Sequence, residues 1–264
     1  MKKVRLHQYL SKTVEFCGKK NIYAAIRNGE ISVNGKVTRI PGFQLRLTKP
    51  VYWKGKAVTV VRDKVYLVVN KPAGYLSSRL TDNDLKMEKR SVFSLLKDID
   101  QNVEKTLFCV GRLDENTSGL LLITNDGNLS HKTANPVFEV SKEYESELAE
   151  ELSDDLKSQI EQGVEITLEE NGMLSKYTTK PCSIHVVDST RKKIVITVHE
   201  GKKREIRRMM EAIGNEVIKL HRVAIGELRL DEFSLPEGHY KKIEKEYLME
   251  KLTHQKYAQI KKEL

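Results

Sequence analysis

Cysteine, tryptophan and proline are scarce in this chain: its 264 residues include three cysteines, one tryptophan and six prolines. Cys17, Cys109 and Cys182 are widely spaced, and none has the Cys-x-x-Cys or Cys-His pairing of a tetrahedral metal site. We therefore expect no metal site and predict reduced, structural thiols. Cys109 lies within the apolar run Leu107–Val110, which favours a buried strand position over a nucleophilic role.

Long hydrophobic runs are also missing. The longest apolar runs, such as Leu120–Ile123, are far shorter than the roughly 20 residues that a membrane-spanning helix needs. The basic start Met1–His7 is not followed by an apolar stretch, so a secretory signal is not expected. Hydrophobic residues make up 39% of the chain and the mean hydropathy is −0.48, values typical of a soluble protein. These features predict a cytoplasmic protein without a membrane anchor.

The positive charge of the chain is unevenly placed. The formal net charge is +9, but residues 1–60 contain thirteen Lys and Arg against two Asp and Glu, a net charge of +11. The rest of the chain is nearly neutral. A basic module on a neutral body is typical of a nucleic-acid anchor, because binding to phosphates releases condensed counterions. The alternative at this point is a basic surface that is merely solvated.

The first sixty residues show a regular pattern of elements. Apolar residues recur at helical spacing within Arg5–Val14 and again within Ile22–Ile26, with a glycine-containing break between them. In the next segment, Ile31–Val37, an Asn34-Gly35 pair stands between β-branched residues, which is a strong hairpin signal. The order helix, helix, hairpin is therefore predicted for this segment.

This order, with basic residues between the elements, resembles the S4 RNA-binding domain. The resemblance implies a small α/β RNA-binding domain over residues 1–60 and a second domain over residues 61–264. In that family the helices and the start of the hairpin present Lys and Arg to structured RNA. The matching candidates here are Arg5, Lys12, Lys19, Lys20, Arg27, Lys36 and Arg39.

The remainder of the chain mixes strand and helix patterns. Alternating or apolar segments predict strands at Ala57–Val61, which would open the second domain, and at Val65–Asn70, Tyr144–Leu148 and Ile194–Val198. Helical spacing predicts helices at 154–162, 204–213 and 240–264, whereas the polar segment 77–88 is predicted to be a surface loop. Because strands and helices do not alternate regularly, the pattern favours an α+β fold with a mixed, largely antiparallel sheet.

The run Gly111–Gly127 carries the strongest functional signal. It places Asp114 two residues after Arg112, on a short polar loop that leads directly into the apolar run Leu120–Ile123. Taken alone, an Arg-x-Asp tripeptide is usually a turn with a surface acid beside a core strand. The length of the run and its position before a buried strand instead favour a carboxylate held for chemistry.

The run resembles the catalytic motif of the RNA pseudouridine synthases, in the branch that modifies ribosomal RNA, the RsuA/RluB family. Two further segments resemble the same family in the expected order, Asn70–Gly74 upstream and Glu200–Met209 downstream. The resemblance implies isomerisation of a uridine to its C-glycoside in ribosomal RNA or an assembling ribosomal subunit. It also implies that no cofactor is needed, and the protein is expected to be a monomer.

The resemblance also implies roles for individual residues. Asp114 matches the catalytic carboxylate near the sugar, acting as a nucleophile or as a stabiliser of positive charge. Arg207 matches the basic residue that keeps this carboxylate ionised, and Tyr144 matches the tyrosine that stacks on uracil and helps to remove a proton. Arg112 matches the residue that holds the flipped nucleotide or fills the vacated space, its alternative being an ion pair with Asp114 or Glu115.

The upstream motif suggests a structural role. Lys71–Gly74 is predicted to be a rigid turn that ends a strand beneath the site, where a side chain at Gly74 would crowd the catalytic loop. Two other functions remain open from the sequence. One is an inactive ribosomal RNA-binding or ribosome-assembly protein on the same scaffold. The other is a glycosidase or nuclease that uses Asp114, although no second acid or metal-binding cluster accompanies it.

Overall fold

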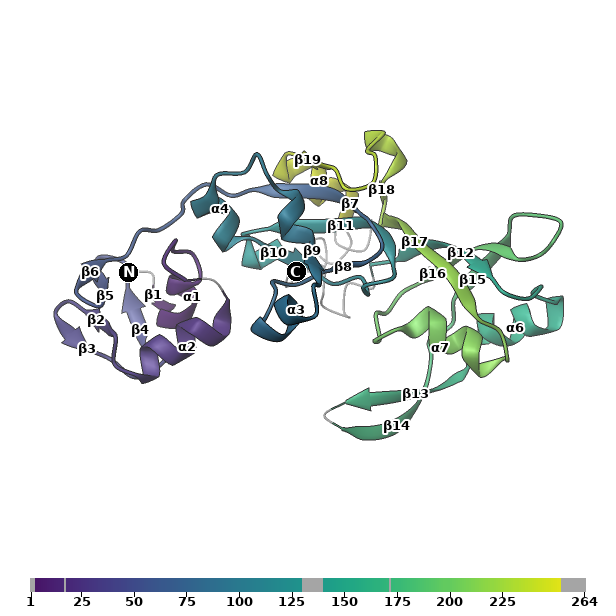
Figure 1. The fold of residues 1–264 in the computed structure, drawn as a ribbon, viewed down its shortest axis with the longest axis horizontal. Coiled ribbons are helices and arrows are strands. Elements are labelled where there is room, and N and C mark those ends of the chain that lie inside the picture. The colour runs from purple at the N-terminus through teal and green to yellow at the C-terminus, as the bar shows by residue number, and fades with distance from the viewer. Residues whose placement is uncertain (1–2, 17, 130–139, 171, 253–264) are drawn as a thin grey trace, which may run out of the picture. The chain divides into compact units, whose positions relative to one another are not determined.

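The computed structural model describes residues 3–16, 18–129, 140–170 and 172–252. The chain divides into two compact units (Figure 1). The first comprises Met1–Val65 with the short segments Leu96–Phe108 and Thr124–Asp126, and the second contains the rest of the chain.

The first unit is built around a small apolar core. Helices α1 (Leu6–Leu10) and α2 (Lys19–Arg27) bury Leu6, Leu10 and Ile26 in this core. The predicted hairpin is formed by β2 (Ile31–Val33) and β3 (Lys36–Val37). Its two turn residues, Asn34 and Gly35, adopt positive φ angles of 49° and 79°. The other elements are β1 (Lys3–Arg5), β4 (Gln44–Arg46), β5 (Val51–Trp53), β6 (Lys56–Ala57) and α4 (Gln101–Thr106).

The segment expected to open the second domain lies in the first unit. The prediction of a strand at Ala57–Val61 was wrong, because the regular strand here is β6 (Lys56–Ala57), which pairs with β5 and shares only Ala57 with the predicted range. Val60 then forms an isolated bridge with Thr13 of the same unit. Later in this unit, Val65 is held against the 124–126 segment by hydrogen bonds to Thr124 and Asn125.

The second unit contains a large mixed sheet, in the strand order β15, β16, β12, β17, β11, β7, β19 (Figure 1). Strand β11 runs parallel to β17, whereas β12 is antiparallel to both of its neighbours, and β19 is antiparallel to β7. The α+β prediction with a largely antiparallel sheet is therefore confirmed. The sheet strands are β7 (Tyr66–Lys71), β10 (Phe108–Val110), β11 (Ser118–Thr124), β12 (Lys142–Leu148), β15 (Ser183–Val186), β16 (Lys193–Val198), β17 (Val217–Ile225), β18 (Leu228–Arg229) and β19 (Tyr240–Lys242).

Smaller elements surround this sheet. Helix α6 (Asp154–Gln162) has the predicted bounds, and α7 (Glu205–Ala212) lies within its predicted range. The two-stranded sheet of β13 (Glu165–Glu170) and β14 (Met173–Thr178) stands apart from the main sheet (Figure 1). The remaining elements are β8 (Tyr75–Leu76), α3 (Asp82–Lys86), β9 (Arg90–Ser91), η1 (Val92–Leu95), η3 (Asp231–Phe233) and α8 (Lys245–Leu252).

Two further element predictions were wrong. The predicted loop 77–88 contains α3, whose start is stabilised by a capping box between Thr81 and Asp84. The predicted helix 240–264 begins only at Lys245, because Tyr240–Lys242 extends the sheet beside β7. Residues 253–264 of that prediction lie outside the described part of the chain.

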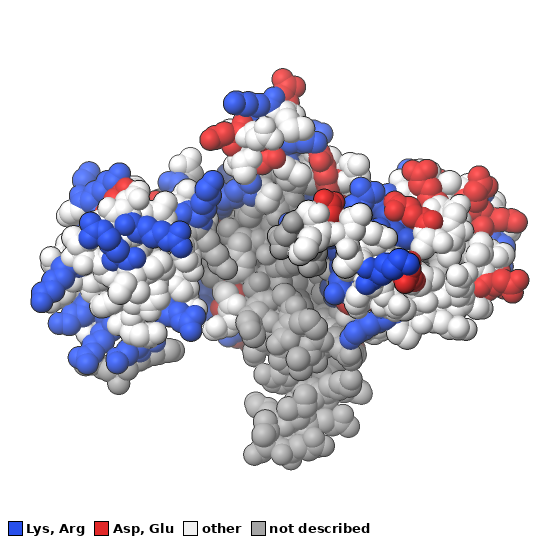
Figure 2. Space-filling model, turned by 90° about the horizontal axis from the view of Figure 1, so that it is seen from below, with Lys and Arg blue, Asp and Glu red and all other residues white. Residues whose placement is uncertain are grey.

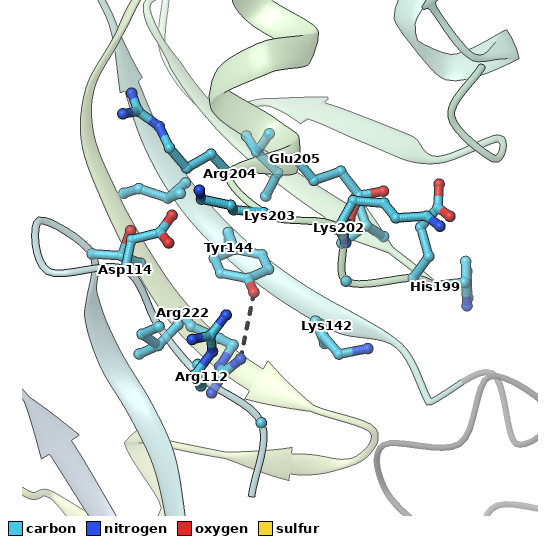
Figure 3. Close-up of a pocket in the computed structure, with 18 of the residues that line it drawn as sticks. Arg112, Asp114, Lys142, Tyr144, His199, Lys202, Lys203, Arg204, Glu205 and Arg222 are labelled. Atoms are coloured by element: carbon cyan, nitrogen blue, oxygen red, sulfur yellow. Dashed lines mark hydrogen bonds between the residues drawn. The ribbon is translucent and has the colours of Figure 1, made fainter. Parts of the chain in front are cut away.

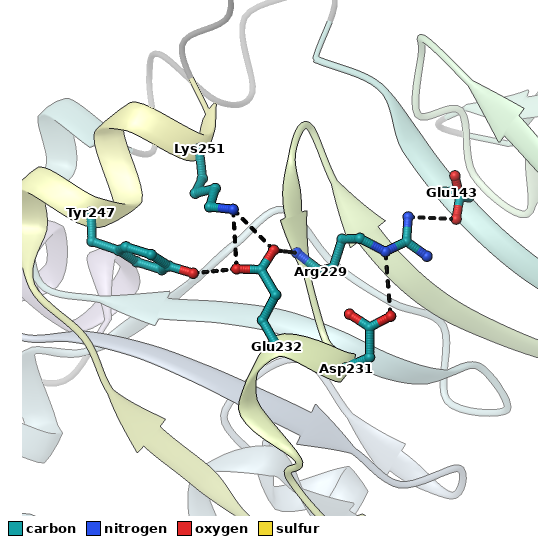
Figure 4. A network of polar contacts seen from close by, with 6 residues as sticks. All are labelled: Glu143, Arg229, Asp231, Glu232, Tyr247 and Lys251. Atoms are coloured by element: carbon teal, nitrogen blue, oxygen red, sulfur yellow. Dashed lines mark hydrogen bonds and ion pairs between the residues drawn. The ribbon is translucent and has the colours of Figure 1, made fainter.

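A network of charged groups connects the end of the second unit to its sheet (Figure 4). Arg229 of β18 contacts Glu143 of β12 at 3.0 Å and Asp231 at 3.4 Å. Glu232 accepts hydrogen bonds from the Tyr247 hydroxyl and from Lys251 of α8. The network fixes η3 and α8 beside the strands that form the pocket described next.

Candidate active site

A pocket of about 540 Å³ lies in the second unit, over β12 and β17 and beside the start of α7 (Figure 3). Its wall combines one loop from before β11 with the segment that precedes α7. Basic groups outnumber acidic ones on this wall. The charged side chains are Arg112, Asp114, Lys142, Lys180, Glu200, Lys202, Lys203, Arg204, Glu205 and Arg222.

Asp114 projects from the loop that leads into β11. The preceding residue, Leu113, is buried and is fixed from both sides by Ser77, whose hydroxyl donates to the Leu113 carbonyl at 2.7 Å and accepts from its N–H at 3.1 Å. The Asp114 carbonyl accepts a hydrogen bond from Thr117 at 3.1 Å. The Asp114 side chain is exposed at the pocket wall.

The buried side chain of Lys71 holds this loop through hydrogen bonds to its main chain. Lys71 ends β7, is 0% exposed, and donates from Nζ to the carbonyls of Pro72 at 2.8 Å, Glu115 at 3.2 Å and Thr117 at 2.8 Å. Burial lowers the pKa of Lys71 to about 8, against the opposing influence of Glu115 and Asp114. From the sequence, this segment was predicted only as a turn. The feature of the sequence that could have indicated the role of Lys71 is its position at the end of an apolar strand.

Gly74 is needed for its backbone conformation. Its φ angle is +79°, and its N–H donates to the Glu115 carbonyl at 2.8 Å, so the turn is tied to the Asp114 loop. A Cβ atom at this position would meet only Arg90, at 3.4 Å. The prediction that a side chain would crowd the catalytic loop was therefore wrong.

Arg207 also holds the Asp114 loop by a hydrogen bond to its main chain. Its guanidinium donates to the Asn116 carbonyl at 3.1 Å and to the Val217 carbonyl at 2.6 Å. Burial and the nearby Arg204 lower the pKa of Arg207, whereas Asp114 acts in the opposite direction. Within the described residues Arg207 makes no ion pair with Asp114, and its hydrogen bonds go to main-chain carbonyls instead.

Tyr144 and Arg222 form the floor of the pocket as neighbours on β12 and β17. Tyr144 is 9% exposed and Arg222 is 3% exposed. The Arg222 Nε donates to the Leu120 carbonyl at 2.8 Å, and Nη1 approaches the Tyr144 hydroxyl at 3.5 Å. The predicted Arg112 is exposed on the same wall, so Asp114, Tyr144 and Arg112 line one pocket.

Two carboxyl groups share a hydrogen bond at the other end of the pocket. Glu205, the first residue of α7, is buried and accepts from the Lys202 N–H at 3.1 Å, while Glu200 accepts from the Tyr177 hydroxyl at 2.5 Å. Burial, followed by the hydrogen bond and charge of Glu200, raises the pKa of Glu205 to about 8. Burial and the neighbouring carboxylate therefore favour the protonated form of Glu205. Neither glutamate was singled out from the sequence.

The predicted RNA-contacting residues of the first unit are on its surface. Lys and Arg cover much of this unit in the space-filling view, with few acidic groups among them (Figure 2). Arg27 lies over the Tyr23 ring at 5.9 Å, and Arg39 packs against Gly29. The side chain of Lys19 lies outside the described part of the chain. The exposed predicted residues are Arg5, Lys12, Lys20, Arg27, Lys36 and Arg39.

The thiols and acids give no sign of other chemistry. Burial raises the pKa values of Cys109 and Cys182 to about 12, which disfavours a nucleophilic thiolate. In the described ranges, no group of three or more His, Cys, Asp or Glu side chains could hold a metal ion. No helix in the same ranges is long and apolar enough to cross a membrane. Cys17 lies outside the described residues.

The chain is similar to known proteins over nearly its whole length. Residues 65–212 match the family model of RNA pseudouridylate synthases. The chain is 32% identical over 228 residues to a ribosomal small subunit pseudouridine synthase A of Vibrio cholerae, which covers 86% of this chain and 91% of that protein. It is also 32% identical to an uncharacterised RNA pseudouridine synthase of Aquifex aeolicus, with 94% and 95% coverage.

A solved structure agrees with this result. A crystal structure of a pseudouridylate synthase matches with a TM-score of 0.64 and 28% sequence identity, covering 94% of this chain and 99% of the solved chain.

Proposed function

Since the chain belongs to the RNA pseudouridylate synthase family, we propose that it converts one specific uridine of ribosomal RNA to pseudouridine. One observation carries this proposal: Asp114 and Tyr144, on separate elements, line the same pocket, and Arg112 stands beside them. The names of the similar proteins favour the small ribosomal subunit as the substrate.

Asp114 is proposed to act at the sugar. The reaction breaks the bond between the anomeric carbon and N1, turns the uracil while it stays bound, and joins it again through C5. Positive charge develops on the anomeric carbon, where a carboxylate stabilises it or forms a covalent bond. Exposure of Asp114 on the pocket wall suits this role, because the carboxylate is accessible to a nucleotide that enters the pocket.

Tyr144 is proposed to stack on the uracil ring and to help remove the C5 proton. Arg112 is proposed to hold the flipped nucleotide or to occupy the space it leaves, since a uridine in folded RNA cannot otherwise reach the carboxylate. Arg207 is proposed to set the position of the Asp114 loop through the Asn116 carbonyl.

Residues 1–60, which form most of the first unit, are proposed to be the RNA anchor, an S4-like domain, and residues 61–264 are proposed to be the catalytic domain. The exposed basic groups of this anchor supply affinity that does not depend on sequence. We further propose that the protein acts in the cytoplasm as a monomer, on ribosomal RNA or on an assembling subunit. The second candidate is a ribosome-assembly protein that binds the same RNA without chemistry.

Asp114→Asn separates these two candidates. The neutral amide keeps the shape of the loop but cannot stabilise positive charge, so we expect turnover to fall by more than about 1,000-fold while RNA affinity stays close to that of the wild type. The measurement is tritium release from RNA labelled at C5 of uridine, with carbodiimide mapping of the product. Asp98→Asn, an exposed acid outside the pocket, is the matched control. Undiminished turnover by Asp114→Asn would remove this residue from the mechanism.

A further inference from the structure

Arg222 carries a buried positive charge without a neutralising acid. Among the described residues it forms no ion pair, and its Nη2 atom is buried without a hydrogen-bond acceptor. Burying a cation is energetically costly unless a partner compensates it. The side chain is also rigidly placed, because Nε is bound to the Leu120 carbonyl of the neighbouring strand. This combination is typical of a group that is preorganised for an anion.

The surroundings add to this charge. Figure 3 shows Arg112, Arg222 and Lys142 around the hydroxyl end of Tyr144. Burial and the charge of Arg222 both lower the pKa of Lys142, and its Nζ donates to the Val140 carbonyl at 3.0 Å. Asp114 lies on the other side of the Tyr144 ring (Figure 3). Three cations therefore gather at the hydroxyl end of Tyr144, whereas the Asp114 carboxylate lies beside the ring, away from that end.

This polarity matches the charge separation in the first chemical step. When the bond between C1′ and N1 breaks, both bonding electrons pass to the uracil, whose negative charge spreads over N1 and the two carbonyl oxygens. Positive charge remains at C1′, facing the carboxylate. C5 later bonds to C1′ and loses its proton, and N1 takes up a proton, so the product is an isomer of the substrate.

We propose that Arg222 stabilises the negative charge of the detached uracil. The guanidinium has only donors, so the Tyr144 oxygen accepts from it, and the hydroxyl hydrogen is left to point into the pocket toward a uracil carbonyl. Arg222 thus acts partly through Tyr144, as a positioning residue, and partly through its own charge. The assignment rests on the proposed function, since it concerns the leaving group of that reaction.

The test compares two RNAs with full-length protein. One fragment of ribosomal RNA contains uridine at the target position, and the other contains 5-fluorouridine, whose base carries negative charge more readily. Single-turnover loss of the N-glycosidic nucleoside is followed by liquid chromatography of nuclease digests, which separates the C-glycoside product from the substrate nucleoside. We expect Arg222→Met to slow cleavage by about 100- to 1,000-fold on the uridine RNA and at least tenfold less on the fluorinated RNA. Arg222→Lys, which keeps the positive charge, should slow cleavage less than Arg222→Met does on both RNAs.

Controls distinguish this role from a structural one. Arg208→Met removes a guanidinium that donates to the Lys203 carbonyl and is not among the residues that line the pocket, so the rates of this variant should stay near those of the wild type. If Arg222→Met does not fold, the smaller loss on the fluorinated RNA is tested with Arg222→Lys. Equal losses on both RNAs would overturn the charge role while leaving the proposed function intact. Wild-type protein that converts neither RNA would overturn the proposed function, and this assignment with it.

Discussion

Glu205 is the buried acid whose protonation the structure defines most clearly. Its carboxyl group lies between the Lys202 N–H and the carboxylate of Glu200, so ionisation would place two negative charges in contact. The pKa of Glu205 is raised from 4.5 to about 8, so the folded protein keeps a proton that the unfolded chain releases near pH 4.5. The resulting stabilisation is fully present below pH 4.5 and is lost as the pH rises to about 8.

Glu205→Gln should remove this pH dependence. Glutamine keeps a donor for Glu200 and an acceptor for the Lys202 N–H, but it cannot ionise. We expect the thermal midpoint of the variant, relative to that of the wild type, to rise steadily between pH 5 and pH 8 and then to level off. Glu211→Gln, an exposed change on the same helix, should show no such trend. A constant difference across this range would show that Glu205 is already ionised in the folded protein.

Residues differ in how far sequence alone could predict their place. Asp114 and Tyr144 were recognised from motifs, and the structure places both on the pocket. Lys71 and Arg222 were not singled out, because a lysine or arginine in a sequence is normally a surface group. Their burial depends on carbonyls supplied by other strands and loops, namely those of Thr117 and Leu120. Such partners become neighbours only in the folded chain.

At the scale of elements, the loop before β11 depends on the end of β7. Lys71→Met keeps an unbranched side chain but leaves the Glu115 and Thr117 carbonyls without their donor, and each such loss costs about 1–3 kcal/mol. Removing a buried charge offsets part of that cost. We expect a lower thermal midpoint and faster hydrogen exchange at 113–118, with turnover reduced by about tenfold or more because Asp114 is less well placed.

Lys89→Met is the matched control for this prediction. Lys89 binds the Glu115 carboxylate at 2.7 Å from a half-buried position, and it contacts the side chain of the loop instead of its main chain. The Lys89→Met substitution should therefore have little effect on hydrogen exchange at 113–118 or on turnover. Unaltered exchange in Lys71→Met would show that the loop keeps its conformation without this lysine.

Elements with regular periodicity were predicted well, and those defined by pairing or capping were not. Helix α6 and strand β7 follow their hydrophobic patterns closely. Helix α3 has no buried residue, so it gave no periodic signal and depends on its capping box. Strand β19 was read as helix because its place is set by pairing with β7, a strand about 170 residues earlier.

At the scale of the whole molecule, positive charge is concentrated in the first unit. Deleting Met1–Val60 removes a net charge of +11 but keeps Asp63 and Val65, which bind the 124–126 segment. We expect RNA affinity to fall and the logarithmic dependence of affinity on salt to flatten by about 0.7–0.9 for each phosphate that the protein no longer neutralises. Titrations of a ribosomal RNA fragment at several salt concentrations measure both. An unchanged salt slope would assign RNA binding to the second unit.

The loop that carries Asp114 is held by hydrogen bonds to its main-chain carbonyls. Lys71 binds the carbonyls of residues 115 and 117, and Arg207 binds that of residue 116. Every amino acid supplies a main-chain carbonyl, so substitutions at positions 115 and 116 keep the acceptors of these hydrogen bonds. Side chains at the rim of the pocket can therefore be replaced, for example to accept a different RNA, while the main chain that carries Asp114 keeps its position.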